Sequence, residues 1–216
     1  MRRVAQGKRF QFKEGNLRML VFFIDKFAGA LVALPLIILF LFLVDKERFT
    51  KKWFWVLLFA IYMNAMLIIV GIPYAQYITW EPSINWIPFQ DFTPSNILGM
   101  VLNIVMLIPF GAFLPIYFKR FRKLLPTVAT GAIMSLTIEI LQLFTFRATD
   151  IDDFIMNTLG AFLGYCIGAF IVRKDEEEEV NKDVIKLIVM VIMSILVVVF
   201  INNPLMTMIL RAMGEI

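Results

Sequence analysis

The feature that most constrains the fold of this chain is a series of long apolar runs that are almost free of charged residues. Each run has about the length of the roughly 20 helical residues needed to cross a hydrocarbon core. A helix satisfies its own backbone hydrogen bonds in lipid, and the runs lack the polar/apolar alternation of a barrel strand. The sequence therefore predicts an all-α fold, a polytopic transmembrane helical bundle of five or six spans. The runs cover residues 27–44, 53–72, 97–118, 124–146, 154–172 and 184–201.

Charged segments between the runs divide the chain into four predicted parts. Residues 1–26 are a basic N-terminal segment, cytoplasmic or interfacial, and residues 27–52 add an apolar segment and a basic loop. Residues 53–201 form the main transmembrane domain, and residues 202–216 form a C-terminal tail. The segment at 27–44 has Pro35 in its middle, so it is either a sixth crossing, which we favour, or a bent segment that dips in and returns.

The distribution of Lys and Arg predicts the orientation of the bundle in the membrane. Loops at 45–52 and 119–123 are basic and are predicted to be cytoplasmic, whereas the loop at 73–95 has no Lys or Arg and is predicted to be outside. The turn at 147–153 then also falls outside. The net charge of +4 suits anionic lipid head groups, and no nucleic-acid partner is predicted.

Glu139 is a charged residue inside an apolar run. Charged groups in lipid are costly, and where they occur they usually face the bundle interior. Ser135, Glu139 and Gln142 recur at helical spacing, and Gly131 falls on the same face. This helix is therefore predicted to turn one polar stripe toward other helices or toward a water-filled cavity.

The following run carries a matching face with Asp153, Asn157 and three glycines at 160, 164 and 168. Glycines at this spacing let a neighbouring helix approach closely. Because a short turn joins the two helices, their polar faces are predicted to meet near the outer surface. Seven polar residues are predicted to converge there on one ligand-binding pocket: Asn103, Glu139, Gln142, Arg147, Asp150, Asp153 and Asn157.

A structural interpretation of these residues stays open. Gln142 and Asn157 would hydrogen-bond between helices, Arg147 would pair with Asp150 or Asp153, and Asp153 would cap the fifth helix. A divalent cation held by the acidic residues is less favoured because Arg147 is near. The chain has no histidine and one cysteine, and neither a metal site nor a cofactor is predicted.

Three stretches together resemble the VanZ-like family of bacterial membrane proteins. They are 85–89 (NWIPF), 103–111 (NIVMLIPFG) and 139–164, which carries E-x-x-Q, R-x-x-D-x-x-D and N-x-x-G patterns. The resemblance runs from about Tyr62 to Val172 and implies a multi-pass protein of the bacterial cytoplasmic membrane. It also implies a link to glycopeptide antibiotics, because founding members of the family confer low-level teicoplanin resistance.

The leading hypothesis is a cell-envelope protein whose outer pocket recognises an anionic amphiphile, either a lipid-linked wall precursor or a lipoglycopeptide, with membrane lipids around it. Arg147 would bind the anionic group, because a guanidinium forks onto carboxylate or phosphate. A second hypothesis is an enzyme acting on a lipid-linked substrate, with an acid–base pair drawn from Glu139, Asp150 and Asp153. The sequence shows no nucleophile motif. A third is a structural partner of another membrane protein.

Overall fold

The computed structural model describes residues 35, 51–90, 93–172 and 181–212. Within these ranges five helices are long and apolar enough to cross a membrane: Phe54–Tyr77, Pro94–Tyr117, Leu124–Gln142, Ile151–Ile171 and Val184–Ile209. The predicted all-α transmembrane bundle is confirmed. The doubtful crossing at 27–44 lies outside the described residues except for Pro35, so it stays a prediction.

Short non-α elements connect the helices at the ends of the bundle. Pro94 occupies the first turn of its helix, where its missing N–H is harmless, and the Thr93 side chain caps the same turn by accepting from the Asn96 N–H at 3.3 Å. The elements in chain order are α2 (Lys51–Val70), η1 (Ala75–Tyr77), β1 (Ser83–Asn85), α3 (Pro94–Tyr117), η2 (Lys119–Arg122), α4 (Leu124–Gln142), β2 (Ala148–Asp150), α5 (Ile151–Ile171), α6 (Asn181–Val197), η3 (Val198–Asn202) and α7 (Asn203–Ala212).

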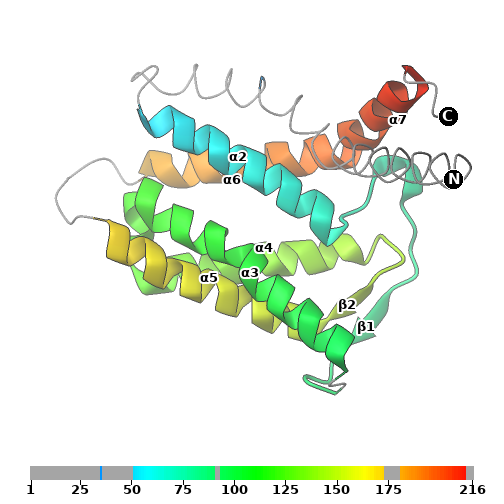
Figure 1. Cartoon of the computed structure of the whole chain (residues 1–216), viewed down its shortest axis with the longest axis horizontal. Coiled ribbons are helices and arrows are strands. Elements are labelled where there is room, and N and C mark those ends of the chain that lie inside the picture. Colours follow the sequence, from blue (N-terminus) through cyan, green and yellow to red (C-terminus); the bar gives the residue numbers. More distant parts are fainter. Residues whose placement is uncertain (1–34, 36–50, 91–92, 173–180, 213–216) are drawn as a thin grey trace, which may run out of the picture.

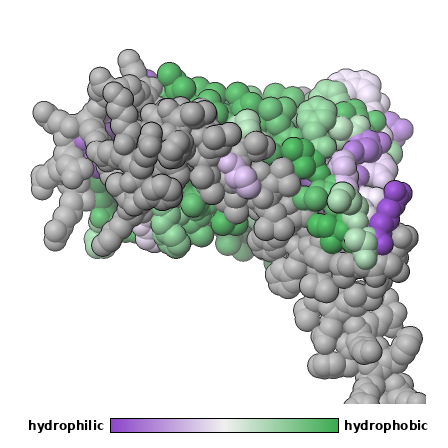
Figure 2. Space-filling view, turned by 90° about the horizontal axis from the view of Figure 1, so that it is seen from above, coloured by the Kyte–Doolittle hydropathy of each residue, from purple (hydrophilic) through white to green (hydrophobic). Residues whose placement is uncertain are grey.

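The helices form two layers (Figure 1). One layer contains α2 and α6, and the other contains α3, α4 and α5, with α3 and α5 running in the same direction. Large apolar side chains, such as Met63, Leu67, Phe110 and Met190, are fully buried and belong to one continuous core cluster. Figure 2 shows hydrophobic residues over the described middle of the bundle, with hydrophilic residues toward its ends.

The strands bring two distant loops to the same end of the bundle. β1 pairs in parallel with β2, in a register that places Ser83 opposite Ala148 and Asn85 opposite Asp150. The loop at 73–95 and the turn at 147–153 therefore share one end, as the charge pattern predicted. We call this end the strand end. Its placement outside the cell stays a prediction.

Two helix ends differ from those read off the apolar runs. α4 stops at Gln142 and not at Phe146, because the chain turns there and the Phe144 carbonyl accepts the Thr79 N–H at 3.1 Å. The last helix does not stop at Ile201, where the apolar run ends, although Pro204 follows closely. A π-helical turn, η3, precedes α7 and accommodates the residue that lacks an N–H, so the helical path continues to Ala212.

Candidate functional site

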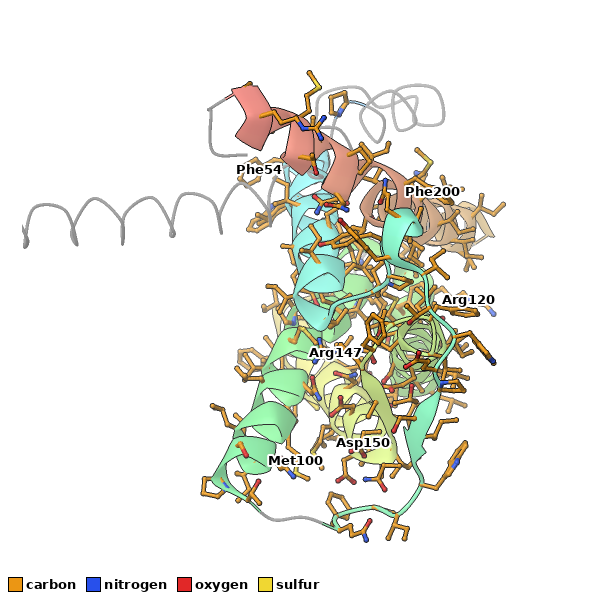
Figure 3. The ribbon with its side chains drawn as sticks, turned by 90° about the vertical axis from the view of Figure 1, so that its right-hand side faces the viewer. Phe54, Met100, Arg120, Arg147, Asp150 and Phe200 are labelled. Atoms are coloured by element: carbon orange, nitrogen blue, oxygen red, sulfur yellow. The ribbon has the colours of Figure 1, made fainter. Side chains whose placement is uncertain are left out.

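A polar cavity of about 220 Å³ opens at the strand end, between the start of α3 and the junction of the strands with α5. Figure 3 looks onto this end and shows Asp150 between α3 and the strand pair. The wall contains three carboxylates and neither Lys nor Arg. Its lining residues are Asn85, Ser95, Asn96, Gly99, Met100, Asp150, Asp152 and Asp153. We call this cavity the acidic pocket.

Asp150 joins the strand pair to the first turn of α5. Its Oδ1 accepts the Asp152 N–H at 2.9 Å, which makes it the N-cap of α5. Its Oδ2 accepts from Asn85 Nδ2 at 3.2 Å, across the register of β1 and β2. The interpretation of Asp153 as the cap was therefore wrong, because the helix begins at Ile151 and not at Phe154.

Asp152 is the buried carboxylate of the acidic pocket, with 6% of its surface exposed. Both of its oxygens accept the Phe89 N–H, at 2.9 and 3.1 Å. Phe89 has a φ of 57°, a left-handed conformation that is uncommon for a bulky residue. A left-handed backbone conformation of this kind persists only where surrounding contacts stabilise it, and the hydrogen bonds to the Asp152 carboxylate are such contacts.

Asp153 lies in the first turn of α5, next to Asp152, and faces α3. Its Oδ1 accepts from Asn103 Nδ2 at 2.5 Å, and both side chains are partly buried. This bond ties the first turn of α5 to α3. Asn103 does not line the pocket itself, and it acts on the pocket by fixing Asp153.

Glu139 lies directly behind Asp150. Its Oε2 accepts the Asp150 N–H at 3.2 Å, and the side chain is 4% exposed. Its Oε1 is buried and has no hydrogen-bond partner among the described residues. Glu139 thus supports the backbone at the start of α5 and is absent from the pocket lining.

Gln142 and Arg147 meet at the end of α2 and do not line the acidic pocket. Gln142 Nε2 and Arg147 Nη1 both donate to the Val70 carbonyl, at 2.7 and 2.6 Å. Figure 3 shows Arg147 toward α2, whereas Asp150 lies toward α3. The predicted pairing of Arg147 with Asp150 or Asp153 is absent from the part of the chain that the structure describes, since Arg147 is engaged with this carbonyl.

Asn157 lies deeper in the bundle, where its Nδ2 donates to Ser135 Oγ at 3.1 Å. The seven predicted site residues thus separate into three groups and do not share one pocket. Asp150 and Asp153 line the acidic pocket, Asn103 and Glu139 support it, and the other three lie elsewhere. The binding role of each residue stays a prediction.

Sequence reasoning missed the part of the pocket wall that Asn85, Ser95 and Asn96 provide, and it left Asp152 out of the seven predicted site residues. Asn85 belongs to the NWIPF stretch, which could have marked it as a site residue. Its position opposite Asp150, which results from the pairing of β1 with β2, could not be predicted from the sequence. Among the described residues, no group of three acidic, His or Cys side chains is arranged to hold a metal ion. The pocket instead presents carboxylate and amide oxygens that accept hydrogen bonds.

Comparison with known proteins gives two matches. The model of a family described as VanZ/LLP1 matches residues 59–173, which include α3, α4, α5 and both strands. Protein VanZ of Enterococcus faecium is 42% identical over 85 residues, which cover 39% of this chain and 51% of that protein. The chain thus spans about half the length of this curated relative. No solved structure matches.

Proposed function

This chain belongs to the VanZ/LLP1 family, whose model matches residues 59–173, and from this premise we propose that it acts in the cytoplasmic membrane of a bacterial cell as an amphiphile-binding protein that contributes to glycopeptide resistance. The five apolar helices support a membrane protein. The family supports a role of the VanZ type. The acidic pocket supports binding at the strand end.

The charge of the acidic pocket decides the chemistry of the proposed ligand. Asp150, Asp152 and Asp153 line it without any Lys or Arg. Like charges repel, so an anionic head group is disfavoured in this cavity, whereas hydroxyl, amide and ammonium groups would donate to the carboxylates. Of the two predicted ligands, the proposal therefore favours a lipoglycopeptide such as teicoplanin over a lipid-linked wall precursor. It would bind through its donor groups and not through the anionic group that Arg147 was predicted to hold.

Apolar side chains next to the pocket support an amphiphilic ligand. Trp86 and Ile87 follow the pocket residue Asn85 and are 72% and 59% exposed. Exposed tryptophans are typical of the boundary between membrane and water. The apolar part of the ligand would stay with this surface in the membrane while its donor groups enter the pocket.

The enzymatic alternative has less support from the geometry. Its main candidate acid, Glu139, is 4% exposed and does not line the cavity. A group that transfers protons to a substrate must come within hydrogen-bond reach of it. Glu139 is instead placed to position the backbone of Asp150.

The test neutralises the pocket while keeping most of its internal hydrogen bonds. In the triple variant Asp150→Asn, Asp152→Asn and Asp153→Asn, the amide oxygens still accept from Phe89 and Asn103 and still cap α5. The bond from Asn85 to the second oxygen of Asp150 is lost, because an Asn side chain has one acceptor oxygen. We expect cells that express this variant to become as susceptible to teicoplanin as cells without the protein.

Glu81→Gln is the matched control, because Glu81 is an exposed acidic residue of the same loop that does not line the cavity. Cells that express it should keep the teicoplanin susceptibility of wild type, with equal amounts of protein in the membrane. Wild-type susceptibility in the triple variant would contradict the proposal.

A further inference from the structure

A second cavity, separate from the acidic pocket, lies between η1 and α7. Its volume is about 410 Å³, and it shares no lining residue with the acidic pocket. The two elements are far apart in the sequence, and both lie at the strand end (Figure 1). The lining residues are Gln76, Tyr77, Asn203, Pro204, Thr207, Met208 and Arg211. We call this cavity the α7 groove.

The α7 groove lies at the boundary of the membrane. Tyr77 is the last residue of the first described span, and Arg211 lies just beyond the span Val184–Ile209. Tyrosine rings are enriched at this depth, and an arginine there keeps its apolar stem along the lipid while its guanidinium reaches the head groups. A molecule in the groove would thus meet lipid chains on one side and water on the other.

The lining of the α7 groove matches the two parts of a phospholipid. Arg211 is its one charged side chain, and no carboxylate lines it. A guanidinium forks onto phosphate oxygens, and the amides of Gln76 and Asn203 add donors beside it. Met208, which is 69% exposed, and Tyr77, which is 65% exposed, supply an apolar wall for the glycerol and the upper acyl chain.

We propose that the α7 groove binds an anionic phospholipid of the surrounding membrane, with Arg211 donating to its phosphate. The positive charge favours a lipid of net negative charge over a zwitterionic one. The groove has opposite charge to the acidic pocket, so the strand end carries two sites with different ligand chemistry. This inference does not depend on the proposed function of the acidic pocket.

Native mass spectrometry of the full-length protein tests this proposal. The delipidated protein in detergent is titrated with phosphatidylglycerol or with phosphatidylcholine of the same acyl chains. We expect wild type to retain phosphatidylglycerol preferentially, and Arg211→Gln to weaken that binding about tenfold, since hydrogen bonds to charged groups are worth roughly a factor of this size. Inorganic phosphate should not displace the lipid, because it lacks the acyl chains.

Arg120→Gln is the matched control, because Arg120 is exposed in η2, which follows the end of α3 that is opposite the strands (Figure 1). It should bind phosphatidylglycerol as wild type does. The proposal is overturned if Arg211→Gln binds phosphatidylglycerol like wild type, or if both arginine variants lose the same amount. If Arg211→Gln shows an altered elution profile in size-exclusion chromatography, Met208→Glu gives the same test by placing a carboxylate in the groove.

Discussion

The helices within the two layers of the bundle pack against each other in different ways. In the layer of α3, α4 and α5, backbone meets backbone: a Cβ atom on Gly164 would lie 2.8 Å from the Ala112 nitrogen and 2.9 Å from the Gly111 Cα. In the layer of α2 and α6, the core consists of large side chains such as Met63 and Met190. Close backbone contact leaves no space for an added atom, whereas a side-chain core can rearrange.

The difference explains why the acidic pocket lies on the glycine-packed layer. The glycines hold α3 against α5 along their length, because a Cβ on Gly160 or Gly168 would also meet the α3 backbone. A seam of this kind fixes the register in which Asn103 meets Asp153 at the strand end. The family match, residues 59–173, covers this layer completely and ends before α6.

Gly164→Ala is the substitution with the largest expected loss of stability. The added Cβ collides with the α3 backbone, which cannot move as a flexible side chain would, so we expect a loss of about 3 kcal/mol or more of unfolding free energy. Thermal unfolding in detergent measures this loss.

The control for this variant is Gly99→Ala, on α3, where an added Cβ meets nothing within 4 Å. It should keep the wild-type unfolding temperature, since alanine is no worse than glycine in a helix. Equal unfolding temperatures for the two alanine variants would refute the glycine seam.

A second variant, Gln142→Leu, breaks a bond between the layers. Gln142 on α4 and Arg147 both donate to the Val70 carbonyl at the end of α2. Removing one of the two donors should cost about 1 kcal/mol, because Arg147 still satisfies the carbonyl. Adding Arg147→Ala should cost more than the sum of the single changes, since the carbonyl then loses its last side-chain donor.

Gln90→Leu, at an exposed position of the strand end, is the control for Gln142→Leu in the same unfolding assay. Strictly additive losses for Gln142→Leu and Arg147→Ala would show that the two donors do not share the Val70 carbonyl.

The smallest expected loss of stability comes from removing a hydroxyl group from one of two buried amide–hydroxyl pairs, one in each layer. Asn157 donates to Ser135, and Asn64 donates to Ser194 at 3.2 Å and also to the Ala60 carbonyl at 2.9 Å. Such bonds average about 0.6 kcal/mol in membrane proteins. Ser135→Ala should therefore cost more than Ser194→Ala, because the Asn64 amide keeps a second acceptor. The reverse order in unfolding temperature would contradict this difference.

The sequence predicted the buried stripe of α4 well. Gly131, Ser135, Glu139 and Gln142 are all buried, as their helical spacing and the cost of polar groups in lipid required. The apolar runs also predicted the five described spans. These features follow from periodicity along one helix, which a single sequence contains.

Contacts between distant segments were not predictable in this way. The pairing of Asn85 with Asp150, the acceptance of the Phe89 N–H by Asp152, and the use of the Val70 carbonyl all depend on backbone atoms or loop geometry. Backbone groups have no signature in the sequence. The hydrogen bond from Arg147 to the Val70 carbonyl at the end of α2 was not predicted, and the binding of an anionic ligand by Arg147 stays a prediction.

The most direct test of the central claim, that the acidic pocket is the binding site, is to map where a ligand touches the protein. A photoreactive teicoplanin derivative is cross-linked to the full-length protein in membranes, and the labelled peptides are identified by mass spectrometry. We predict labelling within residues 93–100 and 150–153, and loss of that labelling in the triple Asp→Asn variant. Labelling confined to the α7 groove or to lipid-facing helix surfaces, unchanged in that variant, would contradict the claim.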